Sequence, residues 1–294
     1  MTEPARRPLL LLVLFVMLAP ARPAPALADI INQLDNQSSA QPITIDAEQG
    51  IEWRRDEKVY LARGNVHAVR GDLAVYADVL TAHYREKPDG STEIWQLTAE
   101  GNVRLASKTE TIYGDRAVYD VDRGVVVVTG KDLRAQTPNE VVTARDSLEY
   151  WDKEQLVVAR GDAQVVQGDK LVRADVLTGH LARAADGTSK LSTVEAQGDV
   201  RISTKTEFVR AAHGIYDLDT QLAVLTGGVK VTRGKNQLNG DRAEVNMKTG
   251  VSRLLASSGA RVHTLITPSD VPKPEERGPV QWAPAQEPEA GRGR

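Results

Sequence analysis

The chain reads Gly64-Asn65-Val66-His67-Ala68 within its first quarter, and this short stretch decides the fold. Val66 and Ala68 lie two and four residues after the glycine with a polar side chain between them, and Tyr60 and Ala62 keep the same spacing before it. Alternation with a period of two is typical of a β-strand that has one dry face and one wet face. The stretch therefore predicts a half-buried strand that runs through the glycine.

The same design recurs along the chain. It returns as Gly101-Asn102-Val103-Arg104-Leu105, as Gly198-Asp199-Val200-Arg201-Ile202 and, shortened, as Gly228-Val229-Lys230-Val231. A second phrase, Ala77-Asp78 and its copy Ala174-Asp175, suits a bend or bulge between such strands. We find no helical period after the first 28 residues. These patterns predict an all-β protein built from many short antiparallel strands.

An internal duplication explains the length of the chain. Residues 41–130 match residues 138–227 without a gap at a spacing of 97, with 31 identities over 90 positions. We assign residues 29–137 to the first half and residues 138–267 to the second half, which includes the closing strands. Strand units of this size cannot each close a core, so neighbouring units must stack with their dry faces inward. The repeats therefore predict an elongated stack made of two facing sheets or of a flattened coil.

The two ends of the chain differ from the repeats. Arg6 and Arg7 precede an apolar run over residues 9–19, and Ala26-Leu27-Ala28 follows it. A basic head, a short apolar stretch and small residues at the end predict a signal peptide over residues 1–28 that is cleaved near Ala28, and hence export. An uncleaved membrane anchor is the alternative. Residues 268–294 are rich in Pro, Glu, Gly and Arg and are predicted to be disordered.

Composition and motifs argue against several classes of function. The chain has 37 Lys and Arg against 40 Asp and Glu, and this balance argues against nucleic acid as a partner. It has no cysteine, its five histidines show no ligand spacing, and it has no phosphate loop or nucleophile motif. The pairs Asp120/Asp122 and Asp217/Asp219 stand between a strand and a turn, where aspartate caps the backbone. We predict no metal, no cofactor and no enzyme, with a polysaccharide-active β-solenoid enzyme or a structural adhesin as the alternatives.

Three segments resemble the LptA family of lipopolysaccharide-transport proteins, in the OstA-like superfamily. Residues 41–47 resemble the opening strand of the family, residues 225–242 its later strands, and residues 261–269 its last strand and exit. The resemblance implies an OstA-like β-jellyroll, a folded sheet that is open at both ends. It also implies a periplasmic carrier that shelters the acyl chains of lipid A in an apolar trough, between transport complexes of the inner and outer membranes. The duplication makes this chain longer than a typical family member.

The resemblance further implies where partners and ligand contact the protein. An LptC-like inner-membrane protein would pair with the N-terminal edge, an LptD-like outer-membrane protein with the C-terminal edge, and copies of the chain could stack head to tail. Inward-facing apolar residues are the candidate contacts with the acyl chains, and ordinary packing is the alternative at each of them. These candidates are Ile43, Ile45, Val66, Ala68, Val75, Leu80, Val103, Leu105, Val128, Val165, Val200, Ile202, Leu225, Val229 and Val231.

Overall fold

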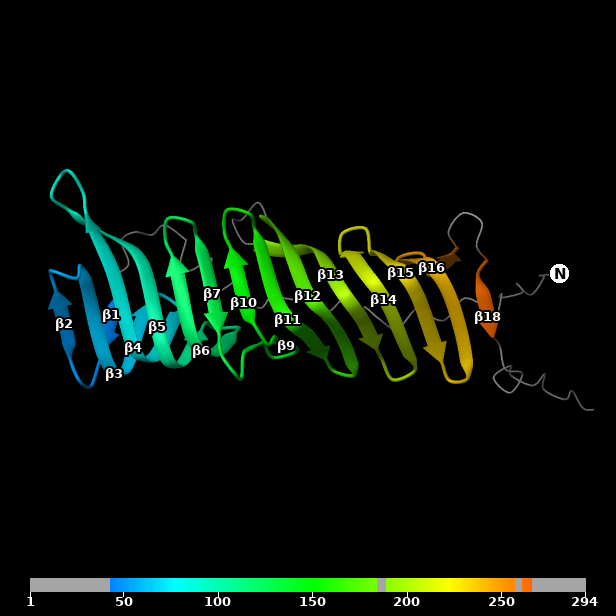
Figure 1. The fold of residues 1–294 in the computed structure, drawn as a ribbon, viewed down its shortest axis with the longest axis horizontal. Coiled ribbons are helices and arrows are strands. Elements are labelled where there is room, and N and C mark those ends of the chain that lie inside the picture. Colours follow the sequence, from blue (N-terminus) through cyan, green and yellow to red (C-terminus); the bar gives the residue numbers. More distant parts are fainter. Residues whose placement is uncertain (1–42, 184–188, 257–260, 266–294) are drawn as a thin grey trace, which may run out of the picture.

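A computed structural model describes residues 43–183, 189–256 and 261–265 of the chain. The described residues form an elongated molecule whose strands succeed one another along its long axis (Figure 1). Eighteen strands form a single sheet, every pair of neighbouring strands is antiparallel, and the described ranges contain no helix. The all-β prediction is confirmed. The predicted signal peptide and the predicted disordered tail lie outside the described residues.

The strands of the first half are β1 (Thr44–Asp46), β2 (Ile51–Arg54), β3 (Val59–Arg70), β4 (Leu73–Glu86), β5 (Thr92–Ala106), β6 (Thr111–Asp120), β7 (Val125–Thr129) and β8 (Arg134–Gln136). Those of the second half are β9 (Val141–Thr143), β10 (Ser147–Trp151), β11 (Leu156–Gln167), β12 (Lys170–Arg183), β13 (Ser189–Ser203), β14 (Glu207–Asp217), β15 (Leu222–Arg233), β16 (Asn236–Asn246), β17 (Val251–Leu255) and β18 (His263–Leu265).

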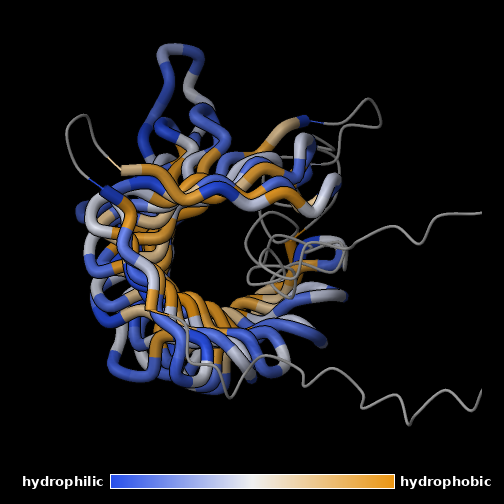
Figure 2. The backbone as a smooth tube through the Cα atoms, turned by 90° about the vertical axis from the view of Figure 1, so that its right-hand side faces the viewer, coloured by the Kyte–Doolittle hydropathy of each residue, from blue (hydrophilic) through white to orange (hydrophobic). Residues whose placement is uncertain are grey.

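A β-bulge divides each of the strands β3, β5, β11, β13 and β15 at the recurring glycine. In β3 the pairing with β4 skips Gly64 and Asn65, which have φ angles of +80° and +42°. Gly198 and Asp199 in β13 repeat this conformation, with φ angles of +74° and +40°. Two successive left-handed residues bend a strand sharply, and glycine adopts this conformation without steric cost. The aligned bulges fold the sheet into two walls, and Figure 2 shows the resulting open C with its hydrophobic side inward.

Cross-strand pairing extends the dry face of each wall over the length of the sheet. In the wall that we call the second wall, one row of directly paired inward residues comprises Ile45, Ala68, Val75, Leu105, Ile112, Ala135, Val142, Val165, Val172, Ile202, Val209, Val231, Leu238 and Thr264. In the first wall, the corresponding row comprises Ile51, Ala62, Leu80, Ala99, Ala117, Val128, Leu148, Ala159, Leu177, Ala196, Gly214, Leu225, Ala243 and Leu254. All but Thr264 are apolar.

The bounds of the strands repeat at the spacing of 97 residues. Strands β3, β4 and β5 recur with identical lengths as β11, β12 and β13. At the seam between the halves, the chain interrupts what would be two long strands, giving β7 with β8 and β9 with β10. Strand β7 pairs with β10 and β8 pairs with β9, so the sheet continues without a gap across the boundary at residues 137 and 138.

The same interrupted arrangement is found at both ends of the sheet. Strands β1 and β2 correspond to β9 and β10 at the spacing of 97 residues. Strands β17 and β18 both pair with β16, as β7 and β8 both pair with β6. The seam therefore joins one terminal arrangement to the other.

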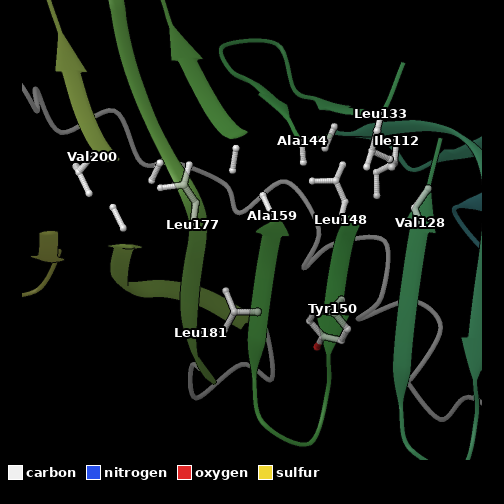
Figure 3. Packing of buried hydrophobic residues seen from close by; sticks show 14 of the residues in the cluster. Ile112, Val128, Leu133, Ala144, Leu148, Tyr150, Ala159, Leu177, Leu181 and Val200 are labelled. Atoms are coloured by element: carbon white, nitrogen blue, oxygen red, sulfur yellow. The ribbon is translucent and has the colours of Figure 1, made fainter. Parts of the chain in front are cut away.

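Large side chains fill the interior at the seam. Leu148 and Tyr150 of β10 are fully buried, and Leu133 from the break between β7 and β8 packs into the same cluster (Figure 3). The Tyr150 hydroxyl donates a hydrogen bond of 3.0 Å to the carboxylate of Asp152, which satisfies its polar group. The centre of the molecule is therefore a packed core.

Candidate functional site

An apolar cavity of 230 Å³ lies between the two walls in the second half. Val165 and Ile202 line it from the second wall, and Leu177 and Leu225 line it from the first wall. Small residues alternate with these large ones along the first wall, and Gly214 lies so close to Leu225 that an added Cβ atom would come within 2.8 Å of its side chain. Space is left where the large side chains of facing walls do not meet.

The structure brings four of the predicted contact residues to this cavity: Val165, Val200, Ile202 and Leu225. The other candidates of the second half, Val229 and Val231, are buried but do not line the cavity. In the first half, the predicted residues that are buried in the interior are Val66, Ala68, Val103, Leu105 and Val128, and those that are half-buried are Val75 and Leu80.

Ile43 and Ile45 differ from the other candidates because they are exposed. They leave 50% and 38% of their surface accessible at the free edge of the sheet, where Ile45 pairs with Ala68 at the end of the inward row. Ile51 and Trp53 of β2, which were not among the predicted contacts, are exposed at the same edge. The apolar interior thus reaches the N-terminal edge without a polar closure.

Further lining residues escaped the sequence analysis. Val172, Leu177 and Val209 line the cavity, and each lies directly opposite a residue of the glycine-centred strands. They belong to strands that lack the glycine phrase, so the motif did not identify them. The pairing register of the hairpins would have identified these three residues, because directly paired residues in a sheet point to the same face.

Two carboxylates stand at the hairpin ends of the second wall, which we call the rim. Glu140 is half-buried and lines the same cavity as Lys170, and burial raises its pKa. Glu207 is 4% exposed, and burial raises its pKa against the weaker lowering effect of Arg233, whose Nη1 atom lies 4.0 Å from the carboxylate. Each of these glutamates is the last residue of a tight turn. The first residue of the turn donates its backbone N–H to the backbone carbonyl of the glutamate.

We expect Glu207→Gln to stabilise the protein at pH 7. The raised pKa means that the folded state retains its proton longer than the unfolded state, so stability falls as the pH rises from the unfolded pKa through the folded one. Removal of the charge should recover about 1 kcal/mol, or ~2–4 °C in melting temperature, at pH 7 and almost nothing at pH 4. Calorimetry at the two pH values measures this difference. The exposed Glu154→Gln is the control, and an equal effect of both variants would refute the assignment.

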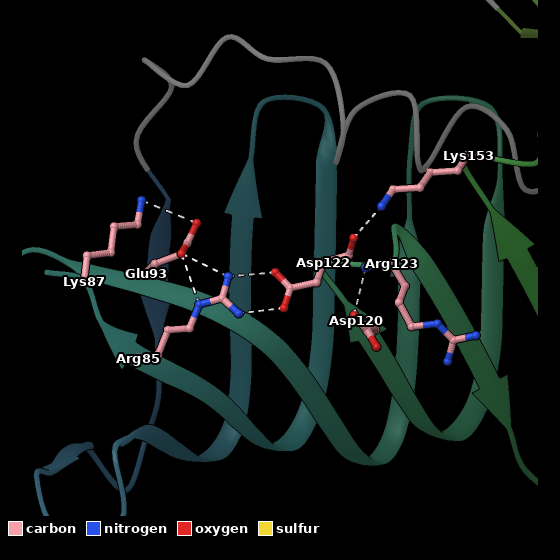
Figure 4. Close-up of polar contacts among 7 residues, drawn as sticks. All are labelled: Arg85, Lys87, Glu93, Asp120, Asp122, Arg123 and Lys153. Carbon is pink, nitrogen blue, oxygen red and sulfur yellow. Dashed lines mark hydrogen bonds and ion pairs between the residues drawn. The ribbon is translucent and has the colours of Figure 1, made fainter.

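The aspartates that could have formed a carboxylate pair take part in structural contacts (Figure 4). Asp122 accepts two hydrogen bonds from the Arg85 guanidinium, at 2.7 and 2.8 Å, and these lower its pKa. Asp120 accepts the backbone N–H of Arg123 at 3.0 Å, and Asp217 does the same for Thr220 at 2.8 Å. Asp120 and Asp217 therefore cap turns, as the sequence indicated, whereas Asp122 forms an ion pair with the side chain of a distant strand residue.

Two other kinds of site are absent from the described residues. They contain no group of three or more His, Cys, Asp or Glu side chains that could hold a metal ion. Nor do they include any helix of the length and apolarity needed to cross a membrane.

The chain is similar to known proteins in two comparisons. The family of LptA/(LptD N-terminal domain) LPS transport proteins matches residues 44–146 and again residues 141–251, and the two matches meet at the seam. Among solved structures, the chain is similar to LptH, the LptA homologous periplasmic component of the conserved lipopolysaccharide transport device from Pseudomonas aeruginosa. The identity is 21% and the TM-score 0.37, over 44% of this chain and 95% of that one. No curated protein matches the chain. Because the two family matches cover well over half of its length, the chain belongs to the LptA/(LptD N-terminal domain) family of lipopolysaccharide-transport proteins, a family of transport proteins and not of enzymes.

Proposed function

We propose that the chain carries lipopolysaccharide through the periplasm, with the acyl chains of lipid A sheltered between the two walls and the sugars outside. The observation that carries this proposal is the pair of uninterrupted apolar rows, one on the inner face of each wall. Each CH₂ group removed from water contributes about 0.8 kcal/mol, so such rows can hold a lipid without any chemical step. Cleavage of the signal peptide near Ala28 belongs to the same proposal.

Loading requires the interior to widen. The cavity of 230 Å³ has room for about eight groups of the size of a water molecule, at ~30 Å³ each, which is less than one set of acyl chains needs. The open side of the C in Figure 2 allows the walls to separate, because no strand of the described residues joins them there. The candidate contacts of both halves would then face the lipid along one trough.

Mass spectrometry of gently purified protein tests this function. We expect lipid A to co-purify with the chain and to be lost after extraction with detergent. Protein that is free of lipid and that cleaves a polysaccharide would contradict the proposal in favour of an enzyme. Protein that is free of lipid and inactive, and that does not take up added lipopolysaccharide, would contradict it in favour of a structural role.

The free edges support a bridging role between membranes. Strands β1 and β2 leave backbone groups and the side chains of Ile43, Ile45 and Ile51 exposed at one edge, and Leu255 and Leu265 are exposed at the other. Edge strands template pairing with another sheet. We assign the N-terminal edge to an LptC-like partner, the C-terminal edge to an LptD-like partner, and both edges to head-to-tail self-association. A photo-crosslink from β1 to the outer-membrane partner in cells would contradict this polarity.

A further inference from the structure

The outer face of the second wall carries a row of cations that face one another. Arg173, Arg201, Arg210 and Lys230 lie on four successive strands, β12 to β15, and each is the direct cross-strand partner of the next. Like charges placed directly opposite in a sheet destabilise it. The chain as a whole has a net charge of −3. The positive charge of this row is therefore a local concentration and does not reflect an excess of basic residues in the chain.

The row continues toward the N-terminus with aromatic rings between the cations. The Arg104 guanidinium lies 3.7 Å from the centre of the Tyr76 ring, and that of Arg134 lies 4.0 Å from the centre of the Tyr113 ring. His67 stacks on the other side of Tyr76, with 4.5 Å between ring centres. These residues are successive cross-strand partners from β3 to β8, on the same face as the four cations.

Most of this positive charge is not neutralised within the protein. Asp162 pairs with Arg173, and Asp199 pairs with Arg201 at 2.5 Å, so two carboxylates stand against six cations. Arg104, Arg134, Arg210 and Lys230 make no salt bridge with any described residue. We call these six cations with Tyr76, Tyr113 and His67 the basic row.

On the outer face of the first wall, three arginines stand beside carboxylates. Arg116 pairs with Glu100 at 3.1 Å, Arg160 with Glu149 at 2.8 Å, and Arg242 with Glu244 at 2.8 Å. A folded sheet of this kind can therefore place its arginines beside carboxylates. Four of the six cations in the basic row have no such partner, and this indicates an anionic ligand from outside the chain.

The shape of the basic row restricts the class of ligand. Neighbouring strands are ~4.8 Å apart, so the eight steps from Arg104 to Lys230 span about 38 Å in single file. The adjacent outer row, toward the rim, has no charge and contains Val69, Ala74, Ala106, Thr111, Gln136, Val141, Val166, Leu171, Ser203, Phe208, Thr232 and Gln237. A protein surface that binds a membrane presents cations over a broad patch. A single row of cations suits a linear polymer as the ligand.

We propose that the basic row binds an extended anionic saccharide chain, bearing phosphate or carboxylate groups, along the long axis of the molecule. Arginine forks bind phosphate and carboxylate groups in a bidentate manner, and the half-buried rings of Tyr76 and Tyr113 stack against the guanidinium groups of Arg104 and Arg134. The spacing of the strands is similar to the length of one hexopyranose unit, so the four adjacent cations from Arg173 to Lys230 meet successive sugars. The ligand lies outside the walls, and its binding does not depend on lipid in the interior.

Titration calorimetry with the full chain tests the proposal, with polygalacturonate as the carboxylate probe, phosphomannan as the phosphate probe and neutral dextran as the reference. Both anionic probes should bind, more weakly at high salt, and dextran should not bind. The quadruple variant Arg104→Gln, Arg134→Gln, Arg210→Gln, Lys230→Gln should lose affinity by at least about tenfold, because four charge contacts are removed. Its melting temperature should change little, because relief of the repulsion between Arg210 and Lys230 offsets the lost stacking of Arg104 and Arg134 on tyrosine rings.

The matched control removes four charges from the outer face of the first wall, with Arg63→Gln, Arg116→Gln, Arg242→Gln and Arg253→Gln. It should retain affinity to within about threefold. Equal losses in both quadruple variants, binding only to phosphatidylglycerol vesicles, or no binding to either anionic probe would each overturn the proposal. Val165→Asp, inside the cavity, should leave saccharide binding unchanged, so a failure of the lipid function is distinguishable from a failure of this site.

Discussion

Replacement of Val165 by aspartate is expected to abolish lipid binding while the protein remains folded. Val165 lines the cavity and lies in the inward row of the second wall, between Val142 and Val172. A carboxylate among acyl chains has no compensating partner in the lipid, and such a charge costs several kcal/mol. We expect affinity for lipid A to fall by about 100-fold or more, measured by the amount of lipid that co-purifies and by titration with added lipopolysaccharide.

The next residue along the same strand provides the control. Val166 points outward and is 41% exposed, so Val166→Asp makes the same change in charge on the other face of β11. It should leave lipid binding unchanged. Lys170 lines the same cavity and could partly neutralise the new carboxylate, so Ile202→Asp on β13 serves as a second interior variant. If both interior variants bind lipid as well as Val166→Asp does, the trough is not the lipid site.

Deletion of residues 67–163 is expected to give a shorter carrier that still folds. The deletion removes one 97-residue repeat and joins Val66 to Gln164, the equivalent of His67, within one composite strand. Every later strand keeps its face, and stacked repeats tolerate the loss of whole units. Six steps between neighbouring strands are lost, so small-angle scattering should show a molecule shorter by about 29 Å. The amount of lipid bound per chain should fall.

A deletion that is one residue shorter tests the role of register. Removal of residues 67–162 leaves Ala163 directly after Val66 and so shifts the rest of that strand by one position. A slip of one residue moves every apolar side chain to the wet face. We expect this variant to be insoluble or to lose its cooperative thermal transition. Similar stability of the two deletions would show that the paired rows do not control folding.

Period-two alternation was sufficient to predict the inward residues of the glycine-centred strands. Val66, Val103, Val200 and Val229 lie two residues after a glycine or at the equivalent position, and all four are fully buried. The bend was only partly located. The sequence assigned it to the phrase around Asp175. The residues with left-handed φ angles are instead Gly198 and Asp199 on the facing strand β13, and the Asp175 carboxylate packs against Gly198.

Other features of the site could not be predicted because they depend on contacts across the molecule. The cavity lies between residues of different walls, such as Leu177 and Ile202, and no local pattern relates residues on different walls. The exposure of Ile45 results from its place on an edge strand, because a residue with the same alternation in a central strand would be buried. The packed seam around Tyr150 follows from the interruption of two strands by a few loop residues.

The seam between the halves has a consequence for assembly. There β7 and β8 meet β10 and β9, which are the counterparts of the strands at the two free ends of the sheet. Two separate chains would form such a contact only after diffusing together. The rate of association and the fraction of chains in contact would then depend on the concentration of the protein. Within one chain the effective concentration of the two faces is fixed by the short loops that join them, so the contact persists at any dilution. The two halves of this protein therefore stay joined in one sheet even in a cell that expresses little of it.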